Sequence, residues 1–595
     1  MESYPNPHET KPRQDGRRSP IHVSMEQALD KGLRATQARF TGGISPIALT
    51  AAFSDWALHL MSSPGKQLAL MEAATKKAKR FGSYVVECGR EPGKAQDCIQ
   101  PLPQDNRFRG EPWQQWPFNM MSQAFLLNQQ FLHNMTTDVE GVTPQHENVV
   151  TFTTRQMLDV FSPSNFALTN PEVLNKTIEQ GGMNLMRGWQ NFVEDTARAN
   201  AGKKPVGVDA FQVGRNMATA KGKVVYRNRL IEMIQYAPTT KTVWPEPIMI
   251  VPAWIMKYYI LDLSAHNSLV QYLTGQGFTV FMLSWKNPDA ADRDLGMDDY
   301  LSMGVMDAIT AIDEITGGEK IHAIGYCLGG TLLSIAAASM ARDRDDRLKT
   351  LTLLAAQVDF TEAGELTLFI NDSQLAYLED MMWEKGYLDT KQMAGAFQLL
   401  RSNDLIWSKV IHDYLMGERT EMSDLMAWNA DATRMPYRMH SEYLRKLFLK
   451  NDLAEGRYIV GERPVAISDI RAPVFIVGTE RDHVAPWHSA YKFNLLSDTD
   501  VTFVLTSGGH NAGIVSEPGH PHRHFRKRIK KKDDPYTDPD HWLANTAPVD
   551  GSWWPELVTW LAYHSGEKTA PPSMGLAEKG YAPQCDAPGT YVMQE

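Results

Sequence analysis

The chain has 595 residues, of which 43% are hydrophobic and 22% are charged, and its net charge is −10. This length allows roughly two to four domains with sizeable apolar cores, and the acidic balance argues against a general nucleic-acid binder. Its four cysteines are too few and too scattered for a disulfide framework or a zinc site. They indicate free thiols in a reducing cytoplasm.

The N-terminal end predicts a polar tail. Residues 1–24 are rich in proline and charge, which predicts disorder. No apolar run follows their basic residues, so we expect no signal peptide. The longest apolar stretch, residues 328–340, is interrupted and too short to span a bilayer, so we expect no transmembrane segment.

Helical patterns follow the tail. Residues 46–63 and 119–139 carry apolar side chains at three- and four-residue spacings, which is typical of amphipathic helices. Another helical pattern covers residues 173–198, and Asn170 in front of a proline predicts its N-cap. We therefore expect a mainly helical N-terminal domain at residues 25–214.

Beyond residue 215 short, dense apolar runs alternate with helical patterns. Fully apolar strands in a β–α alternation favour a doubly wound, mostly parallel sheet. The strand signals stop between about residues 360 and 464, so this interval predicts a helical insertion that covers the sheet as a cap. The predicted strands are 247–252, 279–285, 320–327, 349–357, 473–480 and 501–509.

Residues 520–535 form a basic run, HPHRHFRKRIKKKDDP. A run of like charges usually indicates a solvated surface loop, which is the interpretation we favour. The alternative is a contact with coenzyme A phosphates or with an anionic surface.

The strongest chemical signal is the segment GYCLGG around Cys327. It lies between a predicted strand and an apolar helix, so it has the frame of a nucleophile elbow, G-x-S-x-G, with cysteine in place of serine. The following helix points its N-terminus at the sulfur, which favours a thiolate. The N–H group of Leu328 can also stabilise a developing oxyanion. The alternative is a structural cysteine in a glycine-rich turn.

A nucleophilic cysteine needs a base, and the base needs an acid that orients it. The chain order of this fold, nucleophile, acid, base, is met by Cys327, Asp482 and His510. Asp482 and His510 each follow a predicted strand. His483 competes for the role of base and Glu480 for the role of acid, but we favour His510 beside two small residues and Asp482 on its loop.

Several long stretches resemble the polyhydroxyalkanoate synthases, in particular the long single-chain type. The G-x-C-x-G-G box of that family stands here as GYCLGG, and the likeness runs from about residue 40 to the C-terminus. Trp428 begins a match to the WN-x-D-x-T segment of the family. Other matching stretches are DNRFRGEPWQQWPF (105–118), KYYILDL (257–263), NSLVQYLTGQGFTVFMLSWKNPD (267–289), DHVAPW (482–487) and GSWWP (551–555).

The resemblance implies a role for each site residue. Cys327 becomes the acylated nucleophile and His510 its general base, while Asp482 supports His510 or helps to deprotonate the 3-hydroxyl group of an incoming unit. An α/β-hydrolase-like catalytic domain is implied for residues 215–595. The implied partners are a 3-hydroxyacyl-CoA, the growing polyester chain, the surface of a cytoplasmic polymer granule and a second copy of the chain. No metal and no organic cofactor is implied.

Two positions depart from the family pattern. The loop after the first predicted parallel strand is expected to supply a second oxyanion donor, the backbone N–H of Trp254 or Ile255, and Met256 stands in this loop where the family usually has asparagine. Asn511 follows His510 where an aliphatic residue is more usual. These departures leave the fine geometry and the choice of acyl chain open.

Two other functions fit the same sequence. A thioesterase or polyester depolymerase on the same scaffold can also use a cysteine in an elbow. A non-catalytic granule-associated protein could keep the fold. We favour the polymerase because thiolate attack on a thioester keeps the acyl group activated for a second transfer.

Overall fold

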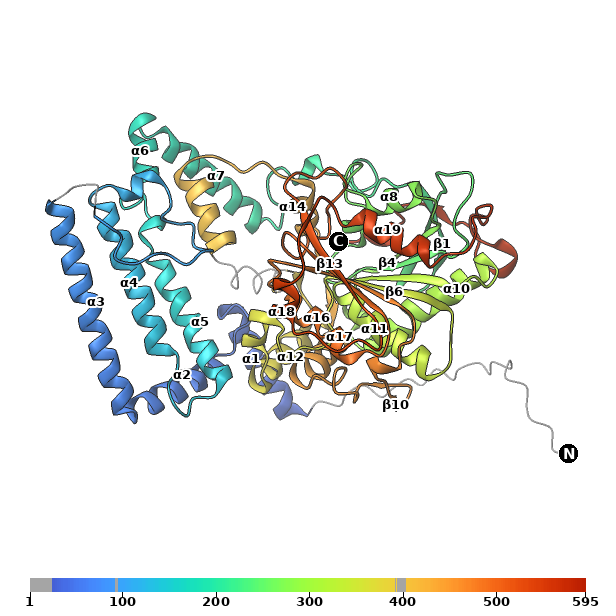
Figure 1. The fold of residues 1–595 in the computed structure, drawn as a ribbon, viewed down its shortest axis with the longest axis horizontal. Helices are drawn as coiled ribbons and strands as arrows, with labels where there is room; N and C mark the ends of the chain where they lie inside the picture. Colours follow the sequence, from blue (N-terminus) through green and yellow to red (C-terminus); the bar gives the residue numbers. More distant parts are fainter. Residues whose placement is uncertain (1–23, 91–94, 391, 393–402) are drawn as a thin grey trace.

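The computed structural model describes residues 24–90, 95–390, 392 and 403–595 (Figure 1). The predicted tail, residues 1–24, lies outside the described residues apart from Ser24. This serine begins helix α1 (Met25–Phe40) through a capping box, because its side chain accepts the N–H of Gln27 and the Gln27 side chain accepts the N–H of Ser24. Among the described residues, no helix combines the length and the apolar character that crossing a bilayer requires.

The N-terminal part of the chain is helical. The predicted cap at Asn170 is confirmed, since its side chain accepts the N–H groups of Glu172 and Val173. The pattern at 173–198 is wrong as a single helix, because Gly181 and Gly182 adopt positive φ angles and separate two helices. The further helices are α2 (Pro46–Met61), α3 (Pro64–Arg90), α4 (Phe118–Thr136), α5 (Pro144–Val160), α6 (Pro171–Glu179) and α7 (Met183–Asn200).

The second half of the chain contains an 11-stranded sheet in the order β14-β13-β12-β11-β6-β5-β3-β4-β2-β1-β15. Its six central strands run parallel and are the six predicted ones, which are therefore confirmed. They are β3 (Ile248–Val251), β4 (Val280–Trp285), β5 (Ile321–Tyr326), β6 (Leu348–Leu354), β11 (Val474–Thr479) and β12 (Val501–Thr506).

Antiparallel strands extend both edges of this sheet. One of them corrects a prediction: the basic run at 520–535 is not only a loop, because His524–Lys530 form β13 and pair with β12. Most of the charged side chains of β13 remain at least partly exposed, so their charge does not oppose pairing. The others are β1 (Gly222–Arg227), β2 (Ile231–Tyr236), β14 (Val549–Asp550) and β15 (Cys585–Asp586).

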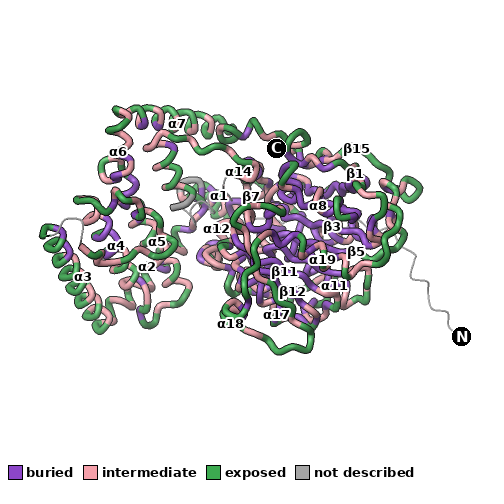
Figure 2. The backbone as a smooth tube through the Cα atoms, turned by 45° about the horizontal axis from the view of Figure 1, so that its top comes forward, coloured by how far each residue is buried: buried purple, intermediate pink, exposed green. Residues whose placement is uncertain are grey.

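Helices flank the sheet and pack against it to form the hydrophobic core. Helix α11 (Leu328–Arg342) packs against β3, β5 and β6, and nearly all of its residues are buried. Figure 2 shows the buried residues concentrated around the sheet, whereas α3 and α7 are largely exposed. The other helices are α8 (Leu269–Gly275), α9 (Met297–Asp299), α10 (Asp307–Thr316), α16 (Trp487–Tyr491), α17 (Phe493–Leu496), α18 (Pro539–Ala544) and α19 (Trp554–Tyr563).

Mainly helical segments lie between β6 and β11, where the sequence predicts a cap. Two short strands, β7 (Tyr387–Leu388) and β8 (Met435–Pro436), pair within this interval. The division of the chain into domains stays a prediction. The helical segments described here include α12 (Asp372–Lys385), the π-helical turn η9 (Val410–Leu415), α14 (Asp424–Asn429), α15 (Tyr437–Tyr443) and the π-helical turn η10 (Leu444–Leu449).

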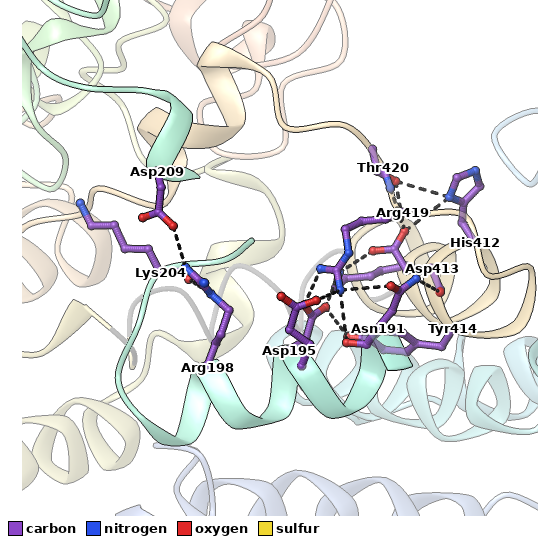
Figure 3. Close-up of polar contacts among 12 residues, drawn as sticks. Asn191, Asp195, Arg198, Lys204, Asp209, His412, Asp413, Tyr414, Arg419 and Thr420 are labelled. Atoms are coloured by element: carbon purple, nitrogen blue, oxygen red, sulfur yellow. Dashed lines mark hydrogen bonds and ion pairs between the residues drawn. The ribbon is translucent and has the colours of Figure 1, made fainter. Parts of the chain in front are cut away.

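Ion pairs join the N-terminal helices to this cap. Lys31 and Arg34 of α1 both pair with the buried Asp380 of α12, each at 2.8 Å. On α7, Asp195 pairs with Arg419 at 2.7 Å and accepts the hydroxyl of Tyr414 at 3.0 Å (Figure 3). Burial acts to raise the pKa of Asp195, but hydrogen bonds from Arg419 and a lysine of the cap outweigh it and hold the pKa below its usual range.

Helix α7 approaches the cap closely enough to require glycine. A side chain at Gly188 would collide with the backbone carbonyl of Tyr414, and one at Gly417 would collide with the carbonyl of Asn184. The two backbones therefore pack directly on each other.

Candidate active site

Cys327 stands in a sharp turn between β5 and α11. Its φ of 52° and ψ of −124° lie in a region that non-glycine residues rarely adopt. The N–H of Cys327 donates to the carbonyl of Leu354 on β6 at 2.9 Å, which ties the turn to the neighbouring strand. A strained strand-to-helix turn is the geometry that lifts a nucleophile above the end of a sheet.

The glycines of GYCLGG make this turn possible. A Cβ on Gly325 would collide with the backbone of Gly330, and a Cβ on Gly330 would lie 2.5 Å from the Cβ of Ala356. A Cβ on Gly329 would collide with the carbonyl oxygens of Val251 and Pro252, where β3 ends. The glycines therefore let α11 start directly against β3, β5 and β6.

Replacing Gly329 by alanine should lower the free energy of unfolding by about 1–3 kcal/mol, because the added methyl forces the backbone of α11 away from β3. Urea denaturation followed by tryptophan fluorescence measures the change. Gly82→Ala is the matched control, since nothing lies within 4 Å of its added Cβ. This exposed position in α3 should gain up to about 1 kcal/mol of helix stability. Equal unfolding midpoints for Gly329→Ala and wild type would contradict the packing described for the turn.

The structure brings Asp482 and His510 together. Asp482 follows β11 and His510 follows the adjacent β12, and His510 Nδ1 lies 2.8 Å from Asp482 Oδ2. The Asp482 side chain is fully buried, and its Oδ1 accepts the N–H groups of Val484 and Ala485 at 2.9 and 2.8 Å. The hydroxyl of Thr479 donates to Oδ2 at 3.0 Å. This network fixes the carboxylate and leaves His510 Nε2 for Cys327.

The charged forms of His510 and Asp482 stabilise each other. Burial acts to lower the pKa of His510, but the Asp482 carboxylate and then the Cys327 thiolate outweigh it and raise this pKa well above its usual value. Burial acts to raise the pKa of Asp482, whereas the charge of His510 and the hydrogen bonds to the carboxylate lower it below its usual range. Cys327 contributes to the increase in the pKa of His510, so its side chain lies close enough to the imidazole to interact with it.

The competing residues lie elsewhere. His483 is exposed, and Glu480 accepts a hydrogen bond from His524 Nε2 of β13 at 3.0 Å. The hydrogen bond of Glu480 does not involve Cys327. The geometry therefore favours Asp482 and His510 over these two alternatives, and their catalytic roles stay a proposal.

Two backbone segments meet beside Cys327. Leu328 is the first residue of α11, so its N–H has no acceptor within the helix. Ile255 lies on the loop after β3 and lines the same cavity as Cys327 and Leu328. The indole of Trp254 instead packs against Trp285 and Tyr300, with ring centroids 5.7 and 4.8 Å away. Therefore the backbone N–H of Trp254, and not its indole, is the group that can serve as an oxyanion donor.

The two departures from the family pattern have structural partners. The backbone of Met256 forms a bridge with Ala432 of the cap, and its side chain is partly buried against the core. Asn511 accepts the hydroxyl of the buried Tyr326 at 2.6 Å and donates to Asn429 at 3.3 Å. Asn511 thus connects the loop of His510 to the cap, a link that the sequence did not reveal.

An apolar cavity opens beside the sulfur of Cys327. Its volume is about 1240 Å³, part of it open to solvent, and the cap forms much of its wall. Gly42, Gly43 and Ile44, between α1 and α2, also line it, which no sequence pattern indicated. The apolar members of the wall include Ile255, Leu328, Leu366, Phe369, Ile370, Leu378, Met381, Leu388, Met435, Leu444, Phe448 and Val484.

No metal site is evident in the part of the chain that the structure describes, since it contains no group of three or more His, Cys, Asp or Glu residues able to hold an ion. The constellation of Cys327, His510 and Asp482 can instead carry out nucleophilic acyl transfer. The adjoining cavity suits an aliphatic acyl group.

Three family models match the chain. A model described as the N-terminus of poly-beta-hydroxybutyrate polymerase matches residues 104–273, and a second N-terminal model of the same polymerase matches residues 24–66. The model of the alpha/beta hydrolase fold matches residues 246–516. This match and the sheet order confirm the predicted fold class.

Full-length relatives extend the likeness. The poly(3-hydroxyalkanoate) polymerase of Methylorubrum extorquens is 39% identical over 551 residues, which cover 91% of this chain and 89% of that protein. The PhaC subunits of Rhizobium etli and Cupriavidus necator are each 36% identical, over 86% and 84% of this chain and 81% and 84% of their own lengths. The chain therefore belongs to the poly(3-hydroxyalkanoate) polymerase family.

Proposed function

We propose that this protein polymerises 3-hydroxyacyl units, delivered as coenzyme A thioesters, through a covalent thioester on Cys327. The observation that carries the proposal is that Cys327, beside the His510–Asp482 pair, opens into a large apolar cavity. The names of the relatives support the substrate and the product. His510 is the base, Asp482 orients it, and the backbone N–H groups of Leu328 and of Trp254 or Ile255 stabilise the oxyanion.

In the first half of the cycle His510 takes the proton of Cys327, and the sulfur attacks the thioester carbonyl. A carbon–sulfur bond to Cys327 forms as the carbon–sulfur bond to coenzyme A breaks. The leaving thiolate takes the proton back from His510 and departs as free coenzyme A. The exchange of one thioester for another keeps the acyl group activated.

In the second half a hydroxyl group of another unit or of the growing chain attacks an acyl thioester. His510, held by Asp482, takes the proton of that hydroxyl, an ester bond forms, and the carbon–sulfur bond breaks. The released sulfur takes this proton from His510, which returns the imidazole to its neutral form. The apolar cap excludes water, which would otherwise hydrolyse the acyl-enzyme. The cycle uses no metal and no organic cofactor.

Incubation with 3-hydroxybutyryl-CoA tests the proposal. We expect release of coenzyme A together with insoluble polymer, measured by a thiol reagent and by gas chromatography of the methanolysed pellet. Free 3-hydroxybutyrate in an amount equal to the released coenzyme A would instead identify a thioesterase.

We propose that the enzyme works in the cytoplasm on the surface of its own polymer granule, as a homodimer. Large apolar side chains are exposed in the N-terminal part: Ile178 of α6 is 78% exposed, Trp189 of α7 is 65% exposed, and Leu168 in the turn before α6 is 81% exposed. Clusters of exposed apolar residues usually mark an interaction surface. They support contact with an apolar polyester.

Narrowing the cavity at Ile44 should change the composition of the polymer. Ile44→Trp places a larger side chain in the wall, so incorporation of six-carbon relative to four-carbon units should fall about 5–10-fold from a mixed feed of both thioesters. Ile47→Trp at the start of α2 is the control, because Ile47 is 68% exposed and lies outside the cavity wall. An unchanged ratio in Ile44→Trp would show that acyl chains do not reach this part of the cavity.

A further inference from the structure

His440 is a buried histidine in the wall of the cavity that contains Cys327. It lies on α15 of the cap and is only 4% exposed. Its Nδ1 has no hydrogen-bond partner among the described residues. A buried polar atom without a partner costs about 1–3 kcal/mol, so its presence beside a nucleophile needs an explanation.

Three other polar side chains of this wall, Thr331, Gln357 and Gln374, bond within the protein. The Thr331 hydroxyl donates to the carbonyl of Gln357 at 2.8 Å, and the Gln357 side chain accepts the hydroxyl of Ser489 at 2.9 Å. Gln374 uses both ends of its amide on the backbone, accepting from Ser45 and donating to Gly43. His440 differs from these three because its Nδ1 has no hydrogen-bond partner among the described residues.

The helix of His440 borders the reaction centre. The residue before it, Met439, accepts the indole N–H of Trp254 at 3.2 Å, on the loop that follows β3. One turn later comes Tyr443, whose pKa is raised by burial and then by the Cys327 thiolate. His440 thus lies between a contact to the oxyanion loop and a residue within the electrostatic reach of the sulfur.

The imidazole of His440 is neutral near pH 7, because burial lowers its pKa to about 4. A neutral imidazole has one N–H donor and one acceptor nitrogen. It is matched to a hydroxyl group, which can both donate and accept. A phosphate or carboxylate would need a cation instead, so an uncharged hydroxyl is the favoured ligand.

We propose that His440 binds the 3-hydroxyl group of the acyl unit that is loaded on Cys327. This inference rests on the proposed function and adds a selection step to it. An acyl unit without the hydroxyl can form the thioester but offers no oxygen for the next ester bond, so it would end the chain. Recognition of the hydroxyl at loading therefore protects elongation.

The test compares 3-hydroxybutyryl-CoA with butyryl-CoA, which lacks only the hydroxyl. Single-turnover release of coenzyme A gives the rate of loading, and intact mass spectrometry of the enzyme gives the adduct on Cys327. Wild type should prefer the hydroxylated thioester, and His440→Leu should reduce this preference about 10–100-fold. His440→Gln keeps a donor and an acceptor, so it should retain part of the preference.

Ser441→Ala is the matched control on the same helix, because Ser441 bonds to Glu379 outside the cavity wall, and it should keep the wild-type preference. The inference is overturned if His440→Leu and His440→Gln, both confirmed as folded by circular dichroism, slow the two thioesters equally. It is also overturned if Ser441→Ala loses the preference while His440→Leu keeps it. Failure of the proposed function looks different, since wild type would then form no adduct on Cys327 with either thioester.

Discussion

Cys327→Ala should abolish polymer formation, with a fall in coenzyme A release of about 10⁴-fold or more. Without the sulfur there is no thioester to hold the acyl group, and His510 and Asp482 have no nucleophile to activate. The cavity and the cap remain, since alanine is smaller than cysteine and the turn keeps its glycines. The expected loss is therefore one of chemistry and not of folding.

The measurement is polymer content in a host that lacks its own synthase, together with coenzyme A release by the purified protein. Cys98→Ala is the control, because Cys98 lies before α4 and outside the cavity wall. Polymer accumulation at the wild-type level in Cys327→Ala would remove the proposed mechanism, whereas absence of polymer with the wild-type protein as well would favour a non-catalytic granule protein.

Asp482→Asn should lower kcat/KM about 10³–10⁴-fold while leaving the shape of the site intact. The amide cannot stabilise the imidazolium of His510, and it can turn its NH₂ group towards Nδ1, which favours the wrong tautomer. The pKa of His510 should fall, because the Asp482 carboxylate makes the largest contribution that raises it. Titration of labelled histidine by ¹³C NMR measures this decrease.

The same substitution should have a pH-dependent effect on stability. The raised pKa of His510 contributes stability that is present below its unfolded value, about 6.5, and is lost as the pH rises through the folded value. The lowered pKa of Asp482 contributes stability that is present above about 4 and is lost as the pH falls through the folded value. The difference in unfolding free energy between wild type and Asp482→Asn should therefore be largest between about pH 4 and 6.5.

Glu480→Gln is the matched control for both experiments, since Glu480 pairs with His524 and not with His510. Its kcat/KM should stay within about threefold of wild type, as expected for a substitution outside the reacting group. A large loss in Glu480→Gln with little change in Asp482→Asn would reverse the assignment of the acid.

The central sheet could be predicted because buried parallel strands consist of continuous apolar residues. Strand β13 could not, because it lies near the edge of the sheet, where the backbone pairs but charged side chains stay in solvent. Its sequence therefore has the composition of a loop. The break between α6 and α7 was missed for the opposite reason, since the apolar spacing continues across Gly181 and Gly182.

The candidate site likewise contains residues that the sequence reveals and residues that it does not. Cys327, Asp482 and His510 are visible in the sequence because a local turn motif and strand ends place them at one edge of the sheet. The contribution of Ile44 to the cavity depends on how α1 and α2 pack on the cap, which no local pattern encodes. His440 carries only a weak signal, a lone histidine among mainly polar and charged neighbours, and such residues are usually structural.

Ion pairs of α1 with α12 and of α7 with the segment around η9 join the cap to the first 200 residues. Movement of the cap away from the sheet must either break both sets of ion pairs or move the N-terminal helices together with the cap. A polyester surface that immobilises those helices therefore also changes the free-energy difference between open and closed positions of the cap. Adsorption to the polyester product would then change the rate at which new thioesters enter the cavity, without any contact near the sulfur of Cys327.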